Sequence, residues 1–222
     1  MEKEKFKWSP VLALGSVWGL GEAAMGIYLR GSCARFITGS VMTGFAIFFI
    51  AAIYSCYRRF LPLFLLLLIT VAFKLLDARL LGLPVLHGAV GNPIFAFYTE
   101  VFAFILIVKI LDSHLNKTAY GHALMGGMAA LVAVNLFPLV KFATGIPACV
   151  VPGTTYPLAL YYAPLAVGLS ALSCPLGMVA GNAFSKEFSL ETGKKKYPGF
   201  VPALVRFIPL SALFLMILLR VG

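Results

Sequence analysis

Seven apolar segments, each about twenty residues long, account for most of this chain. A helix of about 20 apolar residues crosses the hydrocarbon core of a bilayer, and its backbone satisfies its own hydrogen bonds there. With 61% hydrophobic residues and a mean hydropathy of +0.96, the chain fits no soluble class. The sequence predicts an all-α, polytopic transmembrane helical bundle of six or seven spans. The segments are Trp8–Tyr28, Ile37–Tyr57, Phe60–Leu81, Ala89–Val108, Ala123–Val140, Leu158–Asn182 and Phe200–Leu219.

We expect residues 1–222 to form a single integral membrane domain. The longest polar stretch, residues 184–199, is too short to make a second domain. The first segment carries Glu22 and is too long for a cleaved signal peptide, so we expect it to remain in the mature protein. The net charge of +10 is scattered between apolar segments and forms no basic face, which excludes a nucleic-acid partner.

The Lys and Arg residues indicate an orientation. If the spans alternate, twelve of the 18 fall on the side of the N-terminus and six on the other. This bias predicts a multi-pass cell-membrane protein, in contact with membrane lipids, whose N-terminus is cytoplasmic. The third segment ends in the charged run from Lys74 to Arg79. A six-span variant, with that segment or the last one re-entrant, therefore stays open.

Charged side chains inside the predicted spans are the candidates for function, because each costs about 2.5–3.5 kcal/mol at bilayer depth. Glu22 and Lys74 both lie about 9 Å below the outer end of their helices, and Asp77 shares a face with Lys74. Glu100 lies near mid-membrane. These residues, with nearby aromatic and amide side chains, predict an outward-facing polar cavity for a small-molecule solute. The predicted substrate-binding residues are Trp18, Glu22, Lys74, Asp77, Tyr98, Glu100 and Asn135.

The alternative for these residues is purely structural. Glu22 with Lys74, and Glu100 with Arg206, would then be buried ion pairs that hold the helices in register.

Proline and glycine mark two expected breaks at the outer surface, at Asn92-Pro93 and in the link from Gly145 to Pro157. The link either folds over the cavity as a lid or lies at the headgroups as a connector.

Small residues recur at every fourth position in three segments. In the first segment they are Gly15, Gly19 and Ala23, and in the sixth they are Ser173, Gly177 and Gly181. Gly126 and Ala130 mark the fifth segment. Such stripes let helix backbones approach closely in a membrane. We interpret them as packing inside the bundle or, for the first segment, as partner docking.

The chain lacks the motifs of the common enzyme classes. It contains no G-x-x-x-x-G-K-[ST], H-E-x-x-H or G-x-S-x-G sequence, and no clustered Asp pair. We therefore predict no catalytic residues, no metal site and no cofactor, and interpret the protein as a non-enzyme. The two main hypotheses are a small-molecule uptake protein and a membrane anchor or assembly subunit with structural ion pairs. An intramembrane enzyme is the third.

The size, the single helical domain, the Gly15, Gly19 and Ala23 stripe and the missing ATPase motif resemble the S components of energy-coupling-factor vitamin importers. The resemblance covers the organisation of the whole chain and no diagnostic motif. It implies an outer solute site capped by loops. It also implies docking of that stripe on a transmembrane coupling subunit that works with cytoplasmic ATPases. That family has six spans with both termini inside, whereas seven apolar segments place the C-terminus outside.

Overall fold

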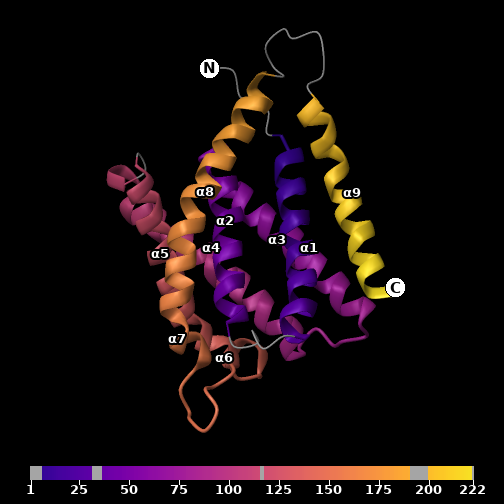
Figure 1. Ribbon diagram of the computed structural model, residues 1–222, viewed down its shortest axis with the longest axis vertical. Helices are drawn as coiled ribbons and strands as arrows, with labels where there is room; N and C mark the ends of the chain where they lie inside the picture. The colour runs from indigo at the N-terminus through magenta and orange to yellow at the C-terminus, as the bar shows by residue number, and fades with distance from the viewer. Residues whose placement is uncertain (1–6, 32–36, 116–117, 191–199, 222) are drawn as a thin grey trace.

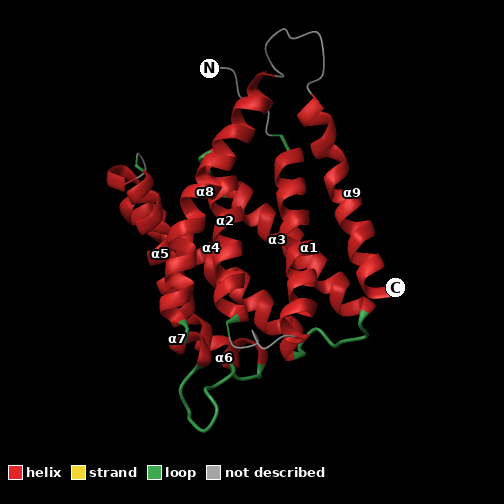
Figure 2. Cartoon of the chain, in the orientation of Figure 1, coloured by secondary structure: helices red, strands yellow, loops and turns green. Residues whose placement is uncertain are grey.

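The computed structural model describes residues 7–31, 37–115, 118–190 and 200–221. Within these ranges every regular element is a helix, apart from one isolated bridge between Val150 and Pro157 (Figure 2). The all-α class predicted from the apolar segments is therefore confirmed.

Each predicted segment corresponds to one long helix, although α4 and α8 extend well beyond the predicted ends. Five of the helices in the described ranges are long and apolar enough to cross a membrane. These five correspond to α2, α3, α4, α5 with its continuation, and α8. The helices are α1 (Ser9–Gly31), α2 (Thr38–Tyr57), α3 (Leu61–Leu80), α4 (Gly88–Leu115), α5 (Ala119–Leu136), η2 (Phe137–Leu139), α6 (Val140–Thr144), α7 (Leu158–Tyr161), α8 (Ala163–Leu190) and α9 (Phe200–Val221).

One expected break is wrong. Asn92-Pro93 does not interrupt the chain, because Pro93 lies within the second turn of α4. Proline is tolerated there at the cost of one backbone bond, since it cannot donate a hydrogen to the carbonyl of Ala89 four residues earlier. The second break is real: the chain leaves regular helix after Thr144, in the link that ends at Pro157.

Glycines of α8 bring the closest helix pair together. A methyl group built on Gly177 would lie 2.3 Å from the carbonyl oxygen of Phe48 in α2, and one on Gly181 only 2.0 Å from that of Ala52. The Ser55 hydroxyl lies 2.8 Å from the carbonyl oxygen of Met178 and can donate to it across the same contact. The small-residue stripe of α8 therefore packs against α2, inside the bundle.

The stripe of α1 is also internal. A methyl group on Gly15 would lie 2.9 Å from Ile69 of α3, and one on Gly19 only 2.4 Å from Phe73. Ala23 is buried, and its carbonyl accepts a hydrogen bond from Arg220 of α9. The structure therefore places this stripe against α3 and α9, so it presents no free docking surface. Gly126 of α5 packs in the same way against α8.

Candidate functional site

A cavity of about 320 Å³ lies among the helices at the end of the bundle that carries α6 and α7, the lower end in Figure 1. It runs from the exposed residues Gly39 and Cys149 to the buried carboxylates of Glu22 and Glu100. Its volume is at the lower end of the range of about 300–1,000 Å³ that is typical of small-molecule sites. Residues of α1 to α5, η2, α7 and α8 line the cavity, so it exists only when these helices are packed together.

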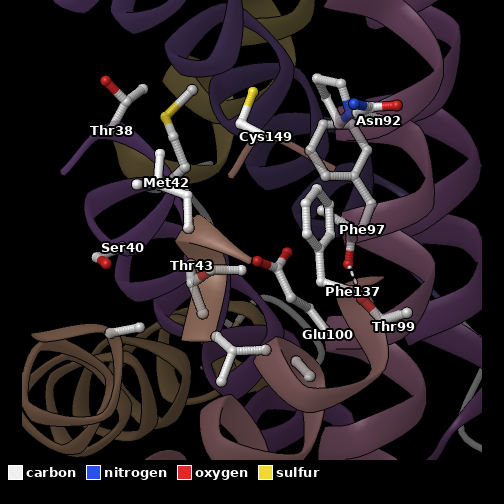
Figure 3. A pocket seen from close by; sticks show the side chains of 18 of the residues that line it. Thr38, Ser40, Met42, Thr43, Asn92, Phe97, Thr99, Glu100, Phe137 and Cys149 are labelled. Carbon is white, nitrogen blue, oxygen red and sulfur yellow. Dashed lines mark hydrogen bonds between the residues drawn. The ribbon is translucent and has the colours of Figure 1, made fainter. Parts of the chain in front are cut away.

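Glu100 projects from α4 into the cavity, toward Thr43 of α2 (Figure 3). Its side chain is only 4% exposed, and it interacts electrostatically with Glu22 from α1 and with the Thr43 hydroxyl. No ion pair between described residues near the cavity includes either glutamate. The two buried carboxylates thus face the same cavity, and neither forms a close ion pair with a described residue.

Glu22 has two further polar neighbours. Lys74 of α3 is near enough to interact with its carboxylate, although the two groups form no close ion pair. The Trp18 indole N–H, one turn earlier on α1, also interacts with Glu22, at a geometry that falls short of a hydrogen bond. Trp18 does not line the cavity. It packs behind Phe97, whose ring centroid is 5.3 Å from that of Trp18, and so fixes the position of that wall.

Asp77 binds the nearby cations. Its carboxylate lies 3.5 Å from the Lys74 ammonium and accepts a charge-assisted hydrogen bond from the Arg220 guanidinium of α9. All three side chains are less than a tenth exposed. Asp77 and Arg220 border a second cavity, of about 270 Å³, and Lys74 lines both cavities. The expected pairing of Glu22 with Lys74 is therefore replaced by a triad centred on Asp77.

The other expected pair is not formed. Arg206 is an exposed residue of α9, whereas Glu100 is buried in α4. The groups that act on the Glu100 carboxylate are Glu22 and Thr43, while α9 packs against α1, α3 and α8.

Two predicted site residues face away from the cavity. Tyr98 is 51% exposed, because two residues correspond to about 200° of rotation and place it opposite Glu100 on α4. Asn135 is exposed on α5, where its amide donates a 2.7 Å hydrogen bond to the carbonyl of Leu131. Of the seven predicted residues, Glu22, Lys74 and Glu100 line the main cavity.

Polar residues that the sequence reasoning missed also line this space. Thr43 lies opposite Glu100, and Ser40, one turn earlier on α2, donates a 3.0 Å hydrogen bond to the carbonyl of Tyr162. The side-chain amide oxygen of Asn92 (Oδ1) is buried and has no hydrogen-bond partner among the described residues. The signal for this set was modest: hydroxyl side chains on one face at the start of an otherwise apolar span, and an amide beside Pro93.

The link expected to form a lid contributes only its base. Cys149 lines the mouth of the cavity, and its carbonyl accepts a 2.8 Å hydrogen bond from the backbone N–H of Leu158. The tip, residues 152–156, is exposed and extends away from the bundle (Figure 2). Cys33, a conceivable disulfide partner of Cys149, lies outside the described residues.

The chain matches no protein-family model, no curated protein and no solved structure.

Proposed function

We propose that this protein is a small-molecule uptake protein that binds its solute in the main cavity. In this proposal the bundle has seven spans, because α1 has 23 residues and α9 has 22, enough for two further crossings. If the spans alternate, twelve of the 18 Lys and Arg residues fall on the side of the N-terminus, and this bias supports an orientation in which that side is cytoplasmic and the cavity opens outward.

One observation carries the proposal: a preformed cavity with apolar walls leads to two buried carboxylates in the middle of a membrane-spanning bundle. Phe97, Phe137 and Met42 supply apolar walls, and Glu22 and Glu100 supply convergent polar groups. A buried charge that only stabilised the fold would be expected to have a close partner, as Asp77 has. Glu22 and Glu100 form no close ion pair with a described residue and instead line a cavity that a solute can occupy.

Filling the cavity should prevent solute binding. Ala96 of α4 lines the cavity, and a phenylalanine there would occupy part of its volume. We expect Ala96→Phe to retain the fold but to lose a small molecule that co-purifies with the wild-type chain in mild detergent, as measured by mass spectrometry. Ala72→Phe, at an exposed position on α3, is the matched control and should keep it. A wild-type chain that carries no compound lost in Ala96→Phe would contradict the proposal.

A membrane anchor or assembly subunit is the second candidate, and the Asp77 triad supports it because buried charges there pair with one another. Glu100→Gln separates the two, because the amide preserves shape and removes only the charge. A binding role predicts normal abundance in the membrane and a loss of co-purified compound of about tenfold or more. A structural role predicts reduced abundance, since groups packed around the carboxylate lose their partner.

Uptake either proceeds through this chain alone or needs a transmembrane coupling subunit and cytoplasmic ATPases. Proteins that co-purify with the full chain in mild detergent distinguish these two arrangements. Because Gly15 and Gly19 contact α3, a coupling subunit would have to bind a surface other than the α1 stripe.

A further inference from the structure

The polar atoms that face the main cavity are unbalanced in favour of acceptors. The carboxylates of Glu22 and Glu100 face the cavity, and the buried side-chain amide oxygen of Asn92 has no partner in the described ranges. Pro93 also leaves the carbonyl of Ala89, another lining residue, without its helical donor. A complementary solute must therefore bring hydrogen-bond donors.

Two hydroxyl donors in the same wall are engaged by backbone carbonyls. Ser40 donates to the Tyr162 carbonyl at 3.0 Å, and Thr99 donates to the Ala96 carbonyl at 2.8 Å. Figure 3 shows this second bond beside Glu100. Among the described residues that line the cavity, the one cation is Lys74, which is held by Asp77. Ser40, Thr99 and Lys74 are thus engaged elsewhere. The described donors that remain near the glutamates are the Thr43 hydroxyl beside Glu100 and the Trp18 indole beside Glu22, and Lys74 acts on Glu22 only at longer range.

The charges around the cavities also favour a solute that carries a positive charge. The described residues around the two cavities include three carboxylates, from Glu22, Asp77 and Glu100, and two cations, from Lys74 and Arg220. Both cations bind Asp77. If all five groups are ionised, their net charge is −1: the Asp77 triad carries +1, and the two glutamates that face the main cavity carry −2.

The rest of the wall selects an organic solute over a metal ion. Phe97 and Phe137 line the cavity beside Glu100, and aromatic rings attract cations at their faces. Within the described residues no group of three or more His, Cys, Asp and Glu side chains is arranged to hold a metal.

We infer that the main cavity binds a small organic cation, whose ammonium or guanidinium group lies between Glu22 and Glu100 and whose apolar part packs on Phe97 and Phe137. This inference rests on the proposed function and adds the chemical class of the solute. Its competitor is a proton shared by the two glutamates, which would leave the cavity with no preference for a cation.

Met42 offers a test that needs no knowledge of the solute, because it lines the cavity one residue before Thr43. Met42→Lys, Met42→Gln and Met42→Glu differ mainly in charge and have similar length. We expect the lysine variant of the full chain to unfold about 3 °C or more above the glutamine variant, and the glutamate variant about as far below it. In a Glu100→Gln background the spread between lysine and glutamate should shrink by at least about half.

Three variants with equal midpoints, or glutamate above lysine, would overturn the inference and favour the shared proton. A common loss of stability in all three measures only the cost of a polar side chain, and the order among them still decides.

The compound lost in Ala96→Phe supplies the second test. We expect it to carry a net positive charge at pH 7, and a neutral or anionic compound would overturn the inference while leaving uptake standing. Absence of any such compound contradicts the proposed function itself, so the two failures are distinguishable.

Discussion

Replacing Gly181 with alanine should lower the midpoint of thermal unfolding in detergent by about 5–10 °C, because the new methyl group would lie 2.0 Å from the carbonyl oxygen of Ala52. That atom belongs to the backbone of α2 and cannot move aside as a side chain would. The helices must separate, which also weakens the hydrogen bonding of Ser55 with Met178 and Asn182. Gly177→Ala, 2.3 Å from the Phe48 carbonyl, should behave in the same way.

Gly168 is the matched control on the same helix. A methyl group there meets nothing within 4 Å, so Gly168→Ala should leave the midpoint unchanged or raise it slightly through helix propensity. If Gly181→Ala were as stable as Gly168→Ala, α2 and α8 would not be in the close contact described above.

Replacing Asp77 with leucine should reduce stability by about 3–5 kcal/mol, because it leaves the cations of Lys74 and Arg220 buried without their shared carboxylate. Arg220 also donates to the Ala23 carbonyl at 3.3 Å, so its displacement loosens the contact of α9 with α1 as well as with α3. The abundance of the protein in the membrane should fall several-fold as unfolded chains are degraded.

A triple variant tests the electrostatic cause. Lys74→Met, Asp77→Leu and Arg220→Met together remove all three charges, and apolar replacement of a buried ion triad is often neutral or stabilising. We expect the triple variant to recover most of the stability lost in Asp77→Leu. Arg79→Met, at an exposed position of α3, is the control and should have little effect. A triple variant no more stable than Asp77→Leu would show that packing, and not charge, is responsible.

Helix identity and approximate bounds were predictable because they depend on local composition. The segment Ile37–Tyr57 differs by one residue at its start from α2, and Phe60–Leu81 differs by one at each end from α3. The largest differences in bounds are at the C-terminal ends of α4 and α8, which continue seven and eight residues beyond the predicted apolar segments. A different kind of error arose where a local signal was ambiguous. Pro93 was interpreted as a break but is tolerated near the start of α4, where few backbone donors are lost.

Three of the predicted site residues were found because depth along a helix can be counted. Glu22, Lys74 and Glu100 were placed in one half of the bundle by their distance from the helix ends, and they do line one cavity. Tyr98 was assigned by its nearness to Glu100 in sequence alone. Two residues along a helix correspond to about 200° of rotation, and this places Tyr98 on the face opposite Glu100.

Ion pairing was beyond sequence reasoning. Depth suggested Lys74 for Glu22, yet Lys74 binds Asp77 one turn away on its own helix. The second partner of Asp77 is Arg220, 143 residues later in the chain. A shared depth along two helices leaves the rotation of each helix and the neighbour it faces undetermined.

The sequence by itself determined that this chain forms helices long and apolar enough to cross a membrane and which of them carry charge, because those properties depend on the composition of each twenty-residue segment. Only the tertiary structure decided that α8 lies against α2, that α1 turns its glycines toward α3, and that Glu22 and Glu100 share a cavity while Asp77 takes the cations. The physical reason is that lipid solvates every apolar face equally well, so hydrophobicity does not select the neighbours of a helix. Close backbone contacts and the pairing of a few buried charges select them, and these form only when all the helices are assembled.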